Sequence, residues 1–278
     1  MTPASTSPDH SAISPWRQDF LQIDGLSVRY HMSGQGSHVL LLHGWGGAIE
    51  SLTPVLNDLQ RAHTVYAFDL PGFGESSSPP SAWGSAEYAQ LTLKVMDRLN
   101  LDRPHLIGHS FGGQVSLRLA AACPERVGKL VLVGSAGIRT RPRLATRLKR
   151  WAARLGKWFA VHGGAIGERL REEIYRRVRS QDYADAGPLR ATLVKVLNED
   201  LTALLPQIKS PTLLVWGEQD RDVPLAAARV MVRSIAGAQL VVFENAGHFA
   251  YLDHFDRFRL LVGRFLREPD RPGESTSV

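Results

Sequence analysis

The run G-H-S-F-G-G at residues 108–113 constrains the fold of this chain more than any other segment. Residues 104–107 before it predict a short apolar strand, and residues 114–122 after it predict a helix. A serine in this context, with a glycine two positions away on each side, matches the G-x-S-x-G elbow. The turn is tight, needs small residues beside the serine, and lifts its hydroxyl clear of the sheet. We therefore expect Ser110 to be a nucleophile.

A serine nucleophile needs a base, and that base needs an acid to orient it. Two candidates follow predicted strands late in the chain: Asp220 comes after residues 212–216, and His248 comes after residues 240–243. Open α/β sheets place their chemistry at the carboxyl ends of the strands. The order serine, aspartate, histidine along the chain is also the order that accompanies this kind of elbow.

Two further motifs make the chain resemble a known family. Residues 42–47 read L-H-G-W-G-G, and residues 69–76 read D-L-P-G-F-G-E-S. Together with the elbow and the two late segments, they are similar to motifs of the α/β-hydrolase superfamily over nearly all of residues 16–267. The resemblance implies an α/β fold with a mostly parallel sheet flanked by helices, an inserted helical cap, and membership of the serine-hydrolase, esterase-like branch.

Matching positions to motifs assigns the catalytic roles. Ser110 is the expected nucleophile, His248 the general base and then the general acid, and Asp220 the acid that orients the imidazole. Glu218 and Asp222 flank Asp220 and could reach His248, but Asp220 fits the G-x-x-D spacing of the family.

The resemblance also predicts the oxyanion hole, formed by the backbone N–H groups of Trp45 and Phe111. His43 and His109 lie beside it in the sequence motifs and are expected to be structural hydrogen-bond partners rather than bases. Aromatic side chains near these motifs are expected around the substrate, with core packing as the alternative for each: Trp45, Phe111, Trp151, Trp158, Phe249 and Tyr251.

The alternation of strands and helices predicts the domain organisation. It breaks off after the strand at residues 130–133 and resumes near residue 210, so the part between is read as an insertion. We predict disordered tails, an α/β-hydrolase core in two pieces and a helical cap, at these residues: tails 1–15 and 268–278, core 16–138 and 206–267, cap 139–205.

Basic residues are concentrated in the predicted cap. Residues 139–179 hold thirteen Lys or Arg and three Glu, a net charge of +10, whereas the whole chain carries +6. Apolar residues recur there at helical spacing, and basic residues fall on the opposite side, which predicts a basic amphipathic helix. Either its charges face water, or they dock an anionic lipid or an acidic carrier protein. No nucleic-acid partner is expected, because no binding module is present.

Composition excludes several classes of protein. Cys123 is the only cysteine, which excludes an intramolecular disulfide and a Cys-based zinc site. No apolar stretch reaches the roughly 18 residues that span a bilayer, and no secretory signal is recognised, so a soluble, cytoplasmic protein is expected. No metal or cofactor is expected, because the chain itself supplies nucleophile, acid, base and oxyanion donors.

Hydrolysis of a carboxylic ester through an acyl-enzyme on Ser110 is the leading hypothesis. Haloalkane dehalogenases and epoxide hydrolases carry an aspartate at the elbow and are excluded. Carbon–carbon bond hydrolases remain the main alternative, although they favour Asn before the nucleophile and Trp after the catalytic histidine, where this chain has His109 and Phe249. Cofactor-free perhydrolases, lactonases, thioesterases and a slow-turnover ligand receptor share the same constellation and also remain open.

Overall fold

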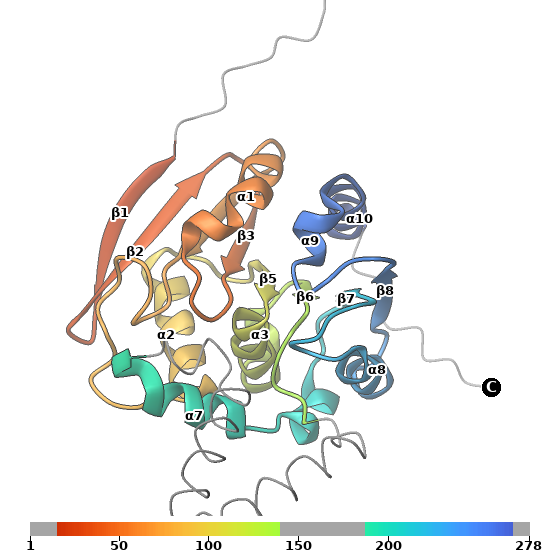
Figure 1. The fold of residues 1–278 in the computed structure, drawn as a ribbon. Coiled ribbons are helices and arrows are strands. Elements are labelled where there is room, and N and C mark those ends of the chain that lie inside the picture. The colour runs from red at the N-terminus through yellow and green to blue at the C-terminus, as the bar shows by residue number, and fades with distance from the viewer. Residues whose placement is uncertain (1–15, 140–186, 269–278) are drawn as a thin grey trace, which may run out of the picture.

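The computed structural model describes residues 16–139 and 187–268, which build one eight-stranded sheet in the order β1-β2-β4-β3-β5-β6-β7-β8 (Figure 1). β1 and β2 form an antiparallel hairpin, β2 pairs antiparallel with β4, and all remaining pairs are parallel. The strands are β1 Arg17–Ile23, β2 Leu26–Ser33, β3 Ser37–Leu42, β4 His63–Phe68, β5 His105–His109, β6 Leu130–Val133, β7 Thr212–Gly217 and β8 Gln239–Phe243.

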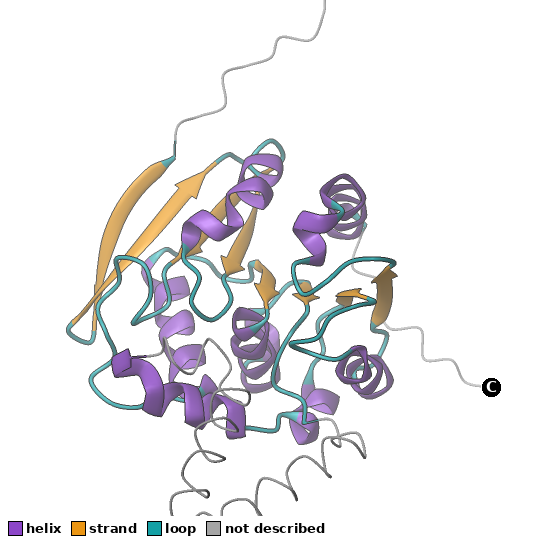
Figure 2. Cartoon of the chain, in the orientation of Figure 1, coloured by secondary structure: helices purple, strands orange, loops and turns teal. Residues whose placement is uncertain are grey.

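Helices cover both faces of the sheet (Figure 2). Helices α2, α3 and α8 pack on one face, and α1, α9 and α10 pack on the other. The α-helices are α1 Thr53–Leu59, α2 Ser85–Arg98, α3 Phe111–Ala122, α7 Arg190–Asn198, α8 Leu225–Ser234, α9 Ala250–Asp253 and α10 Phe255–Arg267. Short 3-10 helices span η1 Ile49–Leu52, η2 Pro124–Arg126, η3 Gly187–Leu189 and η4 Thr202–Gln207.

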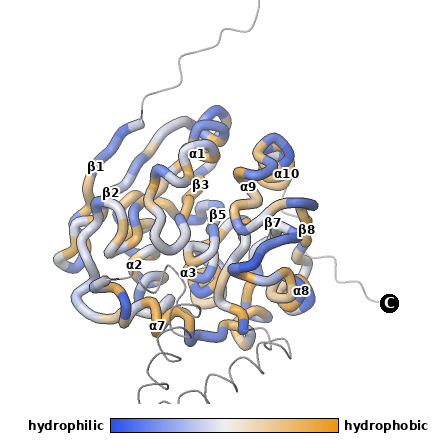
Figure 3. Tube along the Cα trace, in the orientation of Figure 1, coloured by the Kyte–Doolittle hydropathy of each residue, from blue (hydrophilic) through white to orange (hydrophobic). Residues whose placement is uncertain are grey.

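The central strands are buried on both faces, and their sequences are accordingly almost continuous apolar runs. All residues of β6 and β7 are buried. Side chains alternate between the two faces along β3: Leu40 and Leu42 belong to one core cluster, and Val39 and Leu41 belong to the other. The edge strand β1 is mostly exposed and is drawn largely in hydrophilic colours (Figure 3). The predicted fold class is therefore confirmed.

The hairpin at the start of the sheet has a two-residue turn. Ile23 pairs with Leu26, so only two residues make the turn. These residues, Asp24 and Gly25, have φ angles of 51° and 80°. Both central residues of a type I′ turn need positive φ, which an Asp-Gly pair tolerates.

The insertion follows β6 and ends before β7. Its described end contains η3, α7 and η4, and it is attached to the core by side-chain hydrogen bonds. The Gln114 amide of α3 donates to the Val196 carbonyl at 3.2 Å and to Glu199 Oε2 at 3.0 Å. The predicted boundaries of the cap stay a prediction, because residues 140–186 lie outside the described ranges. Within those ranges, no helix has the length and apolar character needed to cross a membrane.

Candidate active site

The predicted elbow is formed where β5 ends at His109 and α3 begins at Phe111. Ser110 between them has φ 51° and ψ −112°, in the left-handed region that non-glycine residues rarely adopt. Its backbone is held on both sides: the Ser110 N–H donates to the Val133 carbonyl at 2.9 Å, and its own carbonyl accepts from Ala136 at 3.0 Å. These bonds to the end of β6 and the turn beyond it stabilise the strained turn.

The glycines of the elbow permit close packing of the backbone. A Cβ atom on Gly108 would lie 2.6 Å from the Gly112 carbonyl oxygen. A Cβ on Gly112 would lie 2.2 Å from the Leu42 carbonyl oxygen at the end of β3. No side chain fits at either position, so both glycines of the G-x-S-x-G pattern are required for α3 to start directly above the sheet.

Asp220 and His248 form the hydrogen bond that a triad requires. Asp220 Oδ2 lies 2.9 Å from His248 Nδ1, and the Asp220 side chain is fully buried. The second carboxylate oxygen accepts the backbone N–H groups of Asp222 and Val223, at 2.9 Å each. A carboxylate held in this way makes Nδ1 the donor of the imidazole, which leaves Nε2 unprotonated and able to accept a proton.

The neighbouring Asp222 has a different role. Its side chain is exposed, and its backbone N–H supports Asp220. Oxygen or nitrogen atoms of Asp220, Asp222 and His248 lie within 4.8 Å of one another, which is a spacing that could hold a metal ion. Both oxygens of Asp220 are already occupied by the imidazole and two amides, and this fits the acid of a triad better than a metal ligand.

Gly134 lies between the Asp220–His248 pair and the elbow. It directly follows Val133, the residue whose carbonyl accepts the Ser110 N–H. A Cβ on Gly134 would lie 3.1 Å from His248 Nδ1 and 3.2 Å from Asp220 Oδ2, and its φ is 51°. The backbone turn after β6 therefore lies against both the elbow and the hydrogen-bonded pair. Asp220 and His248 are thus hydrogen-bonded beyond the carboxyl ends of β7 and β8, and the end of β6 beside them also accepts the Ser110 N–H.

The loop after β3 lies beside Ser110. A Cβ on Gly44 would lie 3.3 Å from the Ser110 Cβ. The rings of Trp45 and Phe111 pack edge to face, with centroids 5.5 Å apart. Neither backbone N–H donates to another residue of the described ranges, and Phe111 is the first residue of α3, where an amide has no acceptor within the helix. The assignment of these two amides to an oxyanion hole remains a prediction. Their N–H groups, free within the described part of the chain, are compatible with it.

His43 is a structural hydrogen-bond partner, as expected. Its Nδ1–H donates to the Gly44 carbonyl at 2.8 Å, and its Nε2 accepts the Leu70 N–H at 3.0 Å. Complete burial lowers the pKa of His43, so the ring stays neutral. It therefore joins the loop after β3 to the loop after β4.

Arg29 was missed by the sequence analysis and supports the same two loops. It is almost fully buried on β2, and its Nε–H donates to Asp69 Oδ2 at 2.7 Å. The guanidinium also bonds Glu50 through two contacts of 2.8 Å, and it bonds Glu75. Asp69 in turn accepts the Ile49 N–H at 2.9 Å. The sequence signal that could have revealed it is a charged residue, Arg29, inside a predicted strand with many apolar residues, which indicates a buried ion pair.

The predicted pocket residues fall into three groups. Trp45 is half-buried, and Phe249 is 47% exposed with its ring 5.5 Å from that of His248. Phe111 and Tyr251 are instead core residues, each 2% exposed, and the Tyr251 hydroxyl donates to the Ser51 carbonyl at 3.0 Å, so little of the surface of either is available to a substrate. Trp151 and Trp158, together with the basic amphipathic helix, lie outside the described residues.

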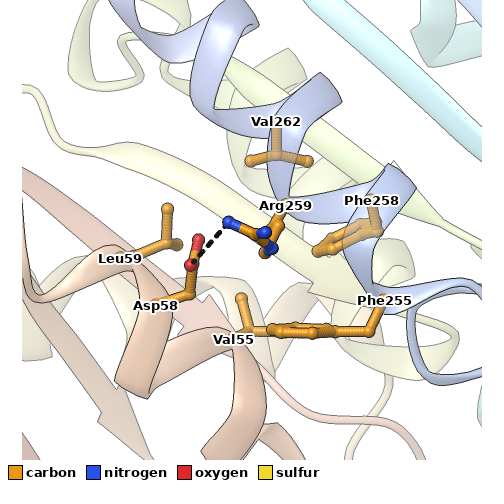
Figure 4. Close-up of a pocket in the computed structure, with 7 residues that line it drawn as sticks. All are labelled: Val55, Asp58, Leu59, Phe255, Phe258, Arg259 and Val262. Atoms are coloured by element: carbon orange, nitrogen blue, oxygen red, sulfur yellow. Dashed lines mark ion pairs between the residues drawn. The ribbon is translucent and has the colours of Figure 1, made fainter.

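A hollow elsewhere on the surface is unrelated to this chemistry. It lies between α1 and α10 and has no room for a water molecule, and Figure 4 shows Asp58 and Arg259 paired across it. The ion pair measures 4.0 Å, and the remaining lining is apolar. None of the three predicted catalytic residues lines it.

Comparison with known proteins identifies the family. The model of the alpha/beta hydrolase family matches residues 39–259. The chain is 32% identical to the 2-hydroxymuconate semialdehyde hydrolase of Pseudomonas putida, over 88% of this chain and 92% of that protein. It is 28% identical to the dihydrolipoyllysine-residue acetyltransferase component of the acetoin cleaving system of Cupriavidus necator, over 95% of this chain and 72% of that protein. The crystal structure of a bacterial membrane phospholipase A is similar with a TM-score of 0.73 and 25% identity, covering 90% of this chain and 86% of that one. The chain belongs to the α/β-hydrolase family.

Proposed function

We propose that this protein hydrolyses a carboxylic ester by acyl transfer through Ser110, with His248 and Asp220 as base and acid. The observation that carries the proposal is the 2.9 Å bond between the buried Asp220 and His248, together with the strained backbone of Ser110 at the elbow. A carboxylate that fixes the imidazole tautomer and a nucleophile held in a rare backbone conformation are features of an acyl-transfer site.

The reaction uses groups of the chain alone. His248 Nε2 takes the proton of the Ser110 hydroxyl as Oγ attacks the ester carbonyl carbon. The negative charge that develops on the carbonyl oxygen is met by the N–H groups of Trp45 and Phe111, each worth about 10²–10³-fold in kcat. Protonated His248 then gives its proton to the leaving alcohol, and water attacks the acyl-enzyme by the same steps.

Cleavage of a carbon–carbon bond is the second candidate. It is favoured by the likeness to the 2-hydroxymuconate semialdehyde hydrolase of Pseudomonas putida, which extends over most of both chains. Two residues beside the catalytic positions argue for the ester: His109 stands before the nucleophile and Phe249 after the base, where carbon–carbon bond hydrolases favour Asn and Trp.

A fluorophosphonate probe and a substrate panel test the proposal. We expect the purified protein to be labelled and to hydrolyse p-nitrophenyl esters of short and medium acyl chains. Ser110→Ala should abolish labelling and lower kcat on the order of 10⁶-fold. Ser116→Ala is the matched control, because Ser116 is a buried serine in α3, the helix that starts directly after Ser110, and its hydroxyl donates to the Gly112 carbonyl.

Two outcomes would contradict the proposal. Stoichiometric labelling of folded Ser110→Ala would place the nucleophile elsewhere. A kcat/KM for a vinylogous 1,5-diketone above that for every ester would favour the second candidate.

A further inference from the structure

We propose that His109 is a positioning residue: its Nε2–H donates to the backbone carbonyl of His248 and fixes the base relative to the elbow. The inference rests on the proposed acyl transfer through Ser110 and adds to it a residue outside the triad.

The contacts of His109 connect it directly to the base. His109 Nε2 lies 3.1 Å from the His248 carbonyl oxygen, although the two residues are 139 positions apart. The two imidazole rings are also in contact, with centroids 4.8 Å apart, and the His109 ring lies 4.9 Å from that of Phe249. Since His109 is the residue immediately before Ser110, one short stretch of backbone carries both the nucleophile and the group that holds the base.

The second ring nitrogen of His109, Nδ1, faces another segment of the site. When Nε2 carries the proton, Nδ1 of a neutral ring carries none. A Cβ built on Gly44 would lie 2.9 Å from His109 Nδ1, so the backbone of the loop after β3 packs against that nitrogen. His109 therefore belongs to the elbow and contacts two further segments of the site. These are the loop after β3, which contains Trp45, and the loop that contains His248.

A neutral His109 is also required by the chemistry. Burial lowers the pKa of His109 to about 4, and charge repulsion from His248 acts in the same direction, whereas the hydrogen bond to the His248 carbonyl raises it. His43 also lowers it, Asp220 raises it, and the ring of Tyr251 packs at 5.2 Å. His248 becomes a cation when it accepts the serine proton, and a second cation in ring contact would oppose that step.

Other hydrogen bonds fix the residues around His248. The bond from His109 therefore sets the position of the His248 backbone carbonyl, and not that of the whole loop. The Gln219 N–H donates to the Ala246 carbonyl at 2.9 Å, and the Gly247 N–H donates to Asp253 at 2.7 Å. After the base, the Leu252 N–H donates to the Phe249 carbonyl at 2.7 Å. Loss of the bond to His248 should therefore alter the orientation of the imidazole while leaving the fold in place.

Replacing His109 by glutamine or leucine separates the hydrogen bond from the packing. The amide nitrogen of glutamine matches the reach of Nε2, whereas leucine fills the space without a donor. We expect His109→Leu to lower kcat on p-nitrophenyl acetate about tenfold more than His109→Gln does, with KM changed by less than about twofold. The acid limb of the pH profile of fluorophosphonate labelling should also move in His109→Leu. Should the leucine variant not fold, His109→Asn gives the same comparison, because its shorter amide does not reach the carbonyl.

His63 supplies the matched control. It is also 5% exposed and uses a ring nitrogen in a hydrogen bond, 2.8 Å from Ser37 Oγ, but it lies at the start of β4 at the opposite end of the strands. His63→Leu should lower thermal stability and leave kcat and the labelling profile unchanged.

The outcomes distinguish this inference from the proposed function. If wild-type protein is not labelled, or if Ser110→Ala keeps its activity, the proposed function fails. If wild-type protein is labelled at Ser110 but His109→Leu retains the wild-type kcat and pH profile, or if His109→Gln loses as much as His109→Leu, only the role of His109 is overturned.

Discussion

The carboxylate of Asp220 is bonded to His248 through one oxygen, at 2.9 Å, and to two backbone amides through the other. The two residues are brought together because β7 and β8 are parallel neighbours and Trp216 pairs with Val242 near their carboxyl ends. Asp220 and His248 each follow the end of one of these strands. The pair is therefore a direct product of sheet register, and the predictions below start from it.

Asp220→Asn should lower kcat about 10⁴-fold, because an amide in place of the carboxylate favours the wrong imidazole tautomer. Asp222→Asn is the matched control, since its exposed carboxylate lies near His248 without a hydrogen bond to it and its backbone N–H to Asp220 remains. Steady-state kinetics on a p-nitrophenyl ester measure both. A larger loss in Asp222→Asn than in Asp220→Asn would show that the acid is misassigned.

Gly112→Ala should destabilise the protein by about 3 kcal/mol or more, because its Cβ would lie 2.2 Å from the Leu42 carbonyl oxygen. Gly263→Ala is the control in the middle of α10, where the nearest contact is the end of Arg267 at 3.4 Å. That change should stabilise the protein by about 0.5–1 kcal/mol, the difference in helix propensity. Denaturant unfolding gives both values, and equal stability of the two variants would contradict the packing.

Arg29→Ala should cost about 3–5 kcal/mol, because it leaves the fully buried carboxylate of Asp69 without its cation. Lys94→Ala removes a cation from an exposed pair with Asp24 and should cost less than about 1 kcal/mol. Equilibrium unfolding in guanidinium chloride separates the two. Arg29→Ala should also slow ester hydrolysis, since Arg29 bonds the loop after β3, which lies beside Ser110, and the loop after β4. A folded variant with wild-type kcat would refute that link.

Stability should fall as pH decreases from 6.5 toward 4. Burial lowers the pKa of His109 from 6.5 to about 4 and also lowers that of His43. In this range the unfolded chain binds protons that the folded protein does not, so the free energy of unfolding decreases. His109 alone should contribute a loss of about 2–3 kcal/mol by pH 4.5.

His109→Gln tests that contribution, because glutamine does not titrate. Denaturant unfolding at pH 7.5 and pH 4.5 should show a smaller loss in the variant than in wild type. An identical loss in both would mean that His109 does not resist protonation in the fold.

Local sequence was sufficient for the parts of the site that a short segment encodes. The glycines around Ser110 mark the elbow because a strand-to-helix turn with a positive φ leaves no room for side chains. The D-G pair at residues 24–25 marks the hairpin for the same kind of reason. Asp220 and His248 were predicted because each follows a recognisable buried strand, and the carboxyl ends of parallel strands share one edge.

Contacts between distant segments were decided only by the tertiary structure. Arg29 meets Glu50, Asp69 and Glu75 because β2 pairs with β4, and Tyr251 packs in the core although it stands close to His248 in the sequence. The bond from His109 to the His248 carbonyl joins residues 139 positions apart. Sequence by itself determined the strands, the turns and the residue types expected for a triad, because local backbone geometry selects them. The order and register of the strands determined which of these segments touch, since they depend on packing across the whole sheet.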